Sequence, residues 1–219
     1  MKLIFLVFLL PLALCGEINS ETDDMNRSTG VVQRGLQDDL KEFVDLIPMN
    51  KIMSVALNYI VADKEVQALY NYIRSEEFRE LYTAAIKTSA VRELIEILES
   101  YGLPVVKYIN QITPLLMLPT YPQRMSAEKA PTKGVNGLVD EILHVLPRDK
   151  LIGLFIQKTI TSHDFRQLLK NLGSEQTLRA VIKFASNKEV RRAYAELNKR
   201  GVDIVTISKK AITYFLNLC

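Results

Sequence analysis

A segment that occurs twice constrains this 219-residue chain more than any other feature. The first copy reads LIPMNKI at residues 46–52, and the second reads VLPRDKL at residues 145–151, 99 positions later. The same offset pairs Ser75-Glu76 with Ser174-Glu175 and Gly102 with Gly201, without any gap. These matches fall where helices start, where helices end and at apolar anchor positions, which are the places a repeated fold constrains most. The sequence therefore predicts an internally duplicated, all-helical unit.

Apolar residues recur at helical spacing through both halves, and no stretch shows the sustained alternation of a strand. Pro48 interrupts this pattern, because proline lacks an N–H group and disfavours a helical conformation in the residue before it. Asp63, Ser75, Ser162 and Ser174 are expected to cap the helices that follow them, and Gly102 is expected to end a helix in the left-handed conformation. The predicted fold is all-α, with two tandem repeats of about six short amphipathic helices each.

The predicted repeats are residues 36–118 and residues 135–219, and together they form one globular unit. Residues 119–134 contain Pro119, Pro122, Pro131 and Gly134, a composition typical of a linker.

Residues 1–15 have the composition of a secretory signal peptide, because Lys2 precedes an apolar run that is too short to span a bilayer. Cleavage is expected near Cys15-Gly16, which predicts a secreted protein. A bacterial lipoprotein signal lipidated on Cys15 is an alternative, although Leu14 fits that pattern poorly. Residues 16–35 are polar and predict a flexible segment with a glycosylation sequon at Asn26. After cleavage Cys219 is the single remaining cysteine, so no internal disulfide is expected.

Charge is distributed unevenly along the chain. Residues 17–134 carry 13 Lys and Arg against 17 Asp and Glu, whereas residues 135–219 carry 14 against 8. A basic second half is compatible with an anionic surface such as lipid headgroups, and a solvated basic face is the plainer interpretation.

The sequence contains no recognisable catalytic or metal-binding motif, so the prediction is a protein that is not an enzyme and has no cofactor and no metal. Asp140 and His144 lie one helical turn apart, but no second histidine stands at metal-ligand spacing. The run Ser162-His163-Asp164 has the letters of a catalytic triad, but adjacent residues do not face one another on a helix. The basic pairs lack interleaved aromatic residues, so no nucleic-acid partner is expected.

The anchor segments and their surroundings resemble the insect allergen-related repeat family, which includes a cockroach midgut allergen, mosquito midgut proteins induced by a blood meal, and butterfly nitrile-specifier proteins. The residues that carry the resemblance are Leu46-Ile47-Pro48, Lys51-Ile52, Tyr59, Asp63, Ser75, Glu77-Phe78, Gly102-Leu103 and Val105 in the first half, and Gly137-Leu138-Val139-Asp140, Leu146-Pro147, Lys150-Leu151 and Gly201-Val202-Asp203 in the second. The second half departs from this pattern, with Lys158 in the place of Tyr59 and Thr177 in the place of Phe78.

The resemblance implies a helical shell around a large apolar cavity that holds fatty acyl chains. The partners it implies are fatty acids or phospholipids, with contact to a membrane surface, in the gut lumen or at the microvillar surface. Apolar positions near helix centres are the expected cavity wall, and ordinary core packing is the competing explanation for each. These positions are Phe43, Val55, Tyr59, Leu69, Ile73, Phe78, Leu94, Leu98, Ile109, Ile142, Leu154, Phe155, Phe165, Leu168, Leu197 and Val205.

Four hypotheses for function follow. The first is a secreted, non-enzymatic lipid-binding and lipid-transfer protein. The second is a membrane-lytic defence protein that strips lipid from membranes. The third is a detoxification protein of the nitrile-specifier type, acting on glucosinolate breakdown, and the fourth is a solid-core helical interaction protein without a ligand.

Overall fold

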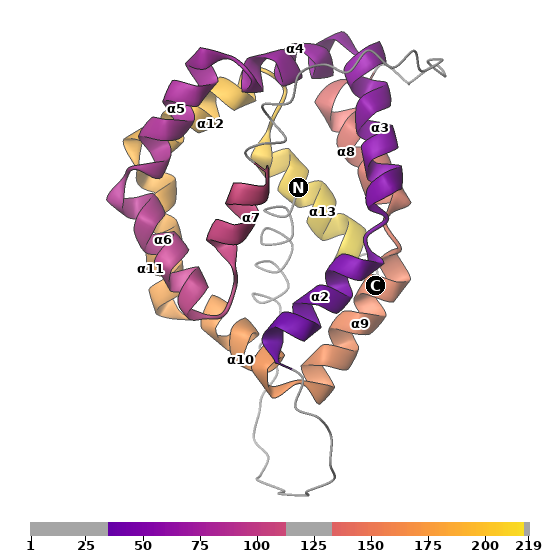
Figure 1. Ribbon diagram of the computed structural model, residues 1–219, viewed down its shortest axis with the longest axis vertical. Coiled ribbons are helices and arrows are strands. Elements are labelled where there is room, and N and C mark those ends of the chain that lie inside the picture. Colours follow the sequence, from indigo (N-terminus) through magenta and orange to yellow (C-terminus); the bar gives the residue numbers. More distant parts are fainter. Residues whose placement is uncertain (1–34, 113–132, 217–219) are drawn as a thin grey trace, which may run out of the picture.

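The computed structural model describes residues 35–112 and 133–216. This part of the chain contains twelve α-helices and no strand, so the all-α prediction is confirmed. In Figure 1 most of these helices follow one another around a closed outline, and α7 and α13 lie within that outline. No helix in the described ranges combines the length and the apolar character needed to span a membrane.

The helices of the first half are short, and turns of a few residues join them. They are α2 (Leu36–Leu46), α3 (Met49–Ala62), α4 (Lys64–Ile73), α5 (Glu76–Ile86), α6 (Ser89–Ser100) and α7 (Val105–Ile112).

The second half contains the helices in the same order. They are α8 (Gly134–Val145), α9 (Arg148–Thr161), α10 (His163–Leu172), α11 (Glu175–Ser186), α12 (Lys188–Asn198) and α13 (Ile204–Leu216). Helices α9 and α10 begin and end 99 residues after α3 and α4, and α11, α12 and α13 begin 99 residues after α5, α6 and α7.

Side-chain caps fix where several helices begin, as the sequence predicts. The Asp63 carboxylate accepts hydrogen bonds from the N–H groups of Glu65 and Val66 at 2.9 and 3.0 Å. Ser75, Ser162 and Ser174 each accept one from the N–H group three residues later. These bonds satisfy N–H groups that have no partner within the first helical turn.

Left-handed glycines end α6 and α12. Gly102 and Gly201 both have φ of 85°, a value that costs residues with a Cβ atom strain. The N–H of Leu103 donates to the carbonyl of Leu98, and the N–H of Val202 donates to that of Leu197. These bonds complete the Schellman arrangement, so the predicted cap at Gly102 is confirmed.

Contacts between the halves are reciprocal. Helix α2 packs on α9 while α3 packs on α8, and α5 packs on α12 while α6 packs on α11. Helix α2 corresponds to α8 and α3 to α9, so the contact of α2 with α9 is the counterpart of the contact of α3 with α8. The contacts of α5 with α12 and of α6 with α11 are related in the same way. The result is an approximate two-fold relation in which both halves contribute the same surfaces to a common interface.

Two clusters of buried apolar residues each draw on both halves. One combines Leu40, Phe43, Leu98, Leu103 and Val105 with Leu151, Phe165, Leu168 and Leu172. The other combines Tyr59, Val66 and Leu69 with Val135. The larger cluster joins α2, α6 and α7 to α9 and α10, and the smaller joins α3 and α4 to α8, so both junctions between the halves bury apolar side chains.

Several sequence predictions concern residues outside the described ranges. These are the signal peptide at 1–15, the sequon at Asn26 and the rest of the polar segment as far as residue 34, linker residues 119–132, and Cys219. Gly134, assigned to the linker by its sequence, is the first residue of α8.

We expect Asp63→Asn to lower the free energy of unfolding at pH 7 by about 2 kcal/mol, because asparagine keeps the cap of α4 but loses the charge and the second acceptor oxygen. That second oxygen of Asp63 accepts a hydrogen bond from the Gly134 N–H at 2.9 Å, at the start of α8. The backbone N–H groups of Val66, Gly134 and Glu65 lower the pKa of Asp63 although burial opposes them. The stabilisation is therefore complete above the ordinary pKa of 3.8 and is lost as pH falls through the lower folded value.

Urea unfolding of wild type and Asp63→Asn at pH 7 and at pH 2.5 checks this expectation. The difference between the two proteins should shrink at the lower pH. An equal difference at both pH values would contradict the assignment.

Candidate functional site

Helix α3 presents three faces of different character. Ile52 and Tyr59 lie on its buried face, against the rest of the fold. At about 100° per residue, Lys51, Ser54 and Asn58 form a second, polar face. On the third face, Met49, Met53, Leu57 and Val61 recur every fourth residue, and their side chains are between 39% and 60% exposed. A helix in an ordinary soluble protein has one apolar stripe, whereas α3 has two.

The same extra face occurs on α9. Ile156 and Ile160 stand 99 positions after Leu57 and Val61 and are 51% and 70% exposed. Leu151 and Lys158 occupy the buried face of this helix. We call the residues Met49, Met53, Leu57 and Val61 of α3, with Ile156 and Ile160 of α9, the exposed apolar rows. Leu178 and Ile182 add a shorter pair of exposed apolar residues on α11, 54% and 59% exposed.

The wall positions expected from the sequence divide by burial. Phe43, Leu98, Phe165 and Leu168 are buried in the first cluster, and Tyr59 and Leu69 are buried in the second. Those six side chains contact other protein side chains, as the core-packing alternative requires. The half-buried positions are Val55, Ile73, Phe78, Leu94, Ile109, Ile142, Leu154, Phe155 and Leu197. Val205 is exposed on α13.

The sequence reasoning did not select any residue of the exposed apolar rows. It selected one apolar stripe for each helix, which is the stripe that packs against the other half. A signal for the second stripe was present, because apolar residues cover about two thirds of the circumference of α3 at helical spacing. When apolar residues cover more of a helix than one packing face needs, the additional apolar surface is not covered by protein.

Lys158, which stands in the place of Tyr59, is accommodated by matching changes in the other half. Its ammonium group is buried, 2.7 Å from Asp39 and 2.9 Å from Glu42 of α2. Burial opposes this charge, but the hydrogen bonds to the two carboxylates outweigh burial and raise the pKa of Lys158. Ser162 also donates to Asp39 at 2.5 Å.

The equivalent place in the other half has a tyrosine and a leucine instead of the lysine and the aspartate. Tyr59 donates to Glu141 at 3.2 Å, and Leu138 stands where the first half has Asp39. Burial, and then the adjacent Glu141 carboxylate, raises the pKa of Tyr59 to about 12. The pair Asp39 and Lys158 is thus the charged counterpart of the pair Leu138 and Tyr59.

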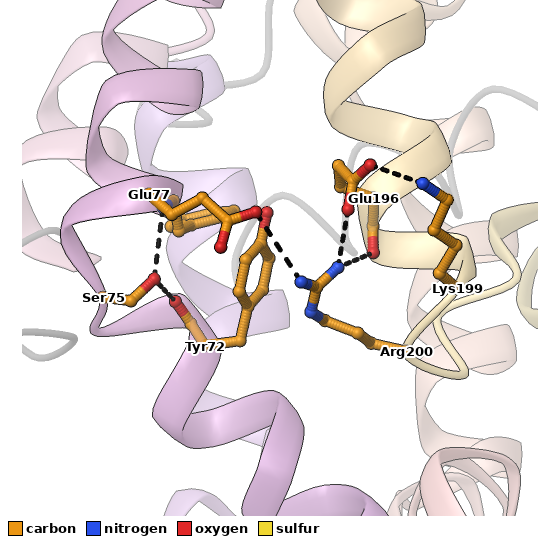
Figure 2. Close-up of polar contacts among 7 residues, drawn as sticks. Tyr72, Ser75, Glu77, Glu196, Lys199 and Arg200 are labelled. Carbon is orange, nitrogen blue, oxygen red and sulfur yellow. Dashed lines mark hydrogen bonds and ion pairs between the residues drawn. The ribbon is translucent and has the colours of Figure 1, made fainter.

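A second contact that differs between the two halves lies between α4 and the end of α12 (Figure 2). The Arg200 guanidinium lies over the Tyr72 ring, 3.4 Å from its centroid. It donates to Glu196 at 2.9 Å and lies 3.7 Å from Glu77. Tyr72 also packs edge-on against Phe78, with ring centroids 5.6 Å apart.

The counterpart of this contact is built from hydroxyl groups. Tyr101 stands 99 positions before Arg200, and its hydroxyl lies 3.0 Å from that of Thr177. Thr177 donates in turn to the carbonyl of Asn171 at 2.8 Å. The two departures from the repeat, Lys158 and Thr177, are therefore each matched by a partner in the opposite half.

A pocket of about 460 Å³ opens between α3 and α8. Its lining residues are Val55, Tyr59, Lys133, Gly137, Asp140, Glu141, His144 and Val145. Four of these side chains can be charged, so the lining differs from a continuous apolar wall. Asp140 is already bound by Lys210 at 2.7 and 2.8 Å.

The described residues offer little to metal or nucleophilic chemistry. No group of three or more His, Cys, Asp or Glu side chains within residues 35–112 and 133–216 could hold a metal ion. Ser162 caps α10 and bonds to Asp39, and His163 faces Asp164 at 3.4 Å on the surface. The residues 162–164 therefore do not form a catalytic relay.

These features define a class of all-α proteins whose two halves exchange packing surfaces and leave apolar helix faces uncovered. A family model described as insect allergen related repeat, nitrile-specifier detoxification, matches residues 35–208. Protein G12 of Anopheles gambiae is 34% identical over 177 residues, which is 78% of this chain and 82% of that protein. The chain belongs to the insect allergen-related repeat family.

We expect Lys158→Met to lower the free energy of unfolding by about 3–5 kcal/mol, because it leaves the buried Asp39 carboxylate without a cation. The double variant Asp39→Leu with Lys158→Tyr should retain most of the wild-type stability, since it reproduces the pair found at Leu138 and Tyr59. Lys150→Met, on the exposed side of α9, is the control and should change stability by about 0.5 kcal/mol or less. Urea unfolding measures all three, and a double variant as unstable as the single would refute the equivalence of the two pairs.

Tyr72 and Tyr59 should respond differently to loss of their hydroxyl groups. The Tyr72 hydroxyl is buried without a hydrogen-bond partner in the described part of the chain, so Tyr72→Phe should leave stability unchanged or raise it by up to about 1 kcal/mol. Tyr59→Phe removes the bond to Glu141 and should cost about 1.5 kcal/mol. Thermal unfolding compares the two variants, and an equal loss of stability in both would contradict this account.

Proposed function

We propose that this protein is a non-enzymatic, secreted lipid carrier that holds fatty acyl chains or phospholipids against the uncovered apolar faces of its helices. The observation that carries the proposal is the pair of exposed apolar rows on α3 and α9. Uncovered rows of this kind cost free energy in water, about 25 cal/mol for each Å² of apolar surface. Alkyl chains that cover them recover about 0.8 kcal/mol for each buried CH₂ group.

The location of the two buried clusters supports the same proposal, because they lie at the junctions between the halves and away from the rows. Each cluster closes one junction between the halves, and neither includes the exposed apolar rows. In this proposal the rows line an interior that lipid completes. Their Met, Leu, Val and Ile side chains supply contact without directional bonds, so the site accepts many chain lengths and discriminates poorly between headgroups.

Two other functions remain alternatives without a specific observation in their favour. A nitrile-specifier activity is linked to the chain through the description of its family. Lysis by extraction of membrane lipid would use the same apolar surface as a carrier. A glucosinolate-breakdown assay and a vesicle-leakage assay, run beside the lipid-binding tests, separate these three activities.

Lipid bound to the purified protein is the direct test. Organic extraction followed by mass spectrometry should recover fatty acids or phospholipids at about one or more chains per protein. Protein that yields no lipid, and that also fails to take up a fluorescent fatty acid after delipidation, would refute the carrier function.

A charge placed in a row should weaken binding, and the same charge on the polar face of the same helix should not. We expect Met53→Glu to reduce affinity for a fluorescent fatty acid by at least about tenfold, because a carboxylate beside an alkyl chain must be desolvated. Ser54→Glu adds the same charge to the polar face of α3 and is the matched control. Circular dichroism of both variants establishes that each is folded, and equal affinity of the two would exclude this row from the ligand site.

A further inference from the structure

The outer surface of α12 forms a basic face, which we define as Lys188, Arg191, Arg192 and Lys199. All four residues are exposed and fall within about one third of the helix circumference at helical spacing. The opposite side of α12, with Val190, Tyr194 and Leu197, is half-buried. Within the described ranges, α12 is the one helix without a fully buried side chain. It therefore lies at the surface of the fold.

The charges of the basic face are largely uncompensated. Within the described part of the chain, Lys188, Arg191 and Arg192 have no carboxylate at ion-pair distance, and only Lys199 is paired, with Glu196 at 2.7 Å. Adjacent on the chain, Arg200 is engaged elsewhere, over Tyr72 and beside Glu196 (Figure 2). Three neighbouring cations without counter-charges repel one another, which is an electrostatic cost that a partner of opposite sign removes.

The fold does not require these charges. The positions equivalent to the basic face, 99 residues earlier on α6, are Ser89, Arg92, Glu93 and Ser100. That set carries one positive and one negative charge at the corresponding positions of the repeat. The same difference in charge occurs at another pair of equivalent positions, where Arg179 of α11 stands 99 residues after Glu80 of α5. Helix packing is satisfied by both sets, so the basic face is a property of this half alone.

We infer that the basic face docks the protein on an anionic lipid bilayer. The inference rests on the proposed carrier function, because a carrier must approach the membrane that supplies or receives its lipid. The four charges lie along one exposed side of a helix rather than around a pocket, which suits a broad layer of headgroup phosphates and carboxylates better than a small ligand. Each basic residue held at such a surface strengthens binding by roughly fivefold, an effect that falls off within the screening length of the salt.

Sedimentation with vesicles tests the inference. The vesicles are phosphatidylcholine alone or phosphatidylcholine with phosphatidylserine, and the variant is Lys188→Gln, Arg191→Gln and Arg192→Gln together. These three residues make no ion pair within the described part of the chain, so their replacement removes charge without breaking a salt bridge. The matched control is Lys51→Gln, Lys64→Gln and Lys107→Gln, which removes the same charge from exposed positions on other helices.

Wild type and the control should bind the phosphatidylserine vesicles, and the α12 variant should bind them roughly 100-fold more weakly. Raising the salt concentration should release the wild type, and pure phosphatidylcholine should retain little of it. Both variants should still take up fluorescent fatty acid, which separates failure of docking from failure of the carrier function.

Four results would overturn the inference. They are equal binding of wild type to both kinds of vesicle, no binding to either kind, equal binding by the two variants, and tight binding to heparin beads without binding to vesicles. The last result would assign the face to an acidic polymer.

Discussion

Neither half of this protein can bury its apolar helix faces without the other half. Helix α2 needs α9, α3 needs α8, and the same reciprocity joins α5 to α12 and α6 to α11. Both buried clusters combine side chains from the two halves, as in the stacking of Phe43 on Phe165 with ring centroids 5.5 Å apart. The hydrophobic effect therefore stabilises the interface between the halves and the halves themselves at the same time. This arrangement satisfies the packing faces while leaving other apolar faces largely exposed.

The exposed apolar rows follow from that arrangement. A helix in a solid bundle is surrounded on its apolar side by other helices, and one stripe serves to fill the core. Helix α3 contacts α8 and α4, yet its apolar residues extend well beyond the side that those contacts cover. The polar side chains of Lys51, Ser54 and Asn58 leave a separate side for water. The exposed apolar row lies between these two sides.

Local features of the fold were predictable from the sequence because they depend on neighbouring residues. Asp63, Ser75, Ser162 and Ser174 cap the helices that follow them, and Gly102 ends α6 with a positive φ. The site was harder to predict, because periodicity shows which residues are apolar and not what covers them. Ile156 on α9 and Phe165 on α10 are both apolar residues of the second half, but Phe165 is fully buried and Ile156 is half exposed. Only the arrangement of the two halves decides between these outcomes.

One junction pairs Asp39 with Lys158 and the other pairs Leu138 with Tyr59, a difference that a single chain containing both halves permits. In a symmetric dimer of identical repeats, one gene would specify both copies. Both junctions would then contain the same pair of residues. Joining the copies in one polypeptide allows each junction to have its own chemistry. One has the ion pair of Lys158 with Asp39, and the other has the hydrogen bond from Tyr59 to Glu141. Joining the copies also frees one outer surface to become cationic while its twin stays balanced. The two sides of a nearly symmetric scaffold are thus chemically distinguishable.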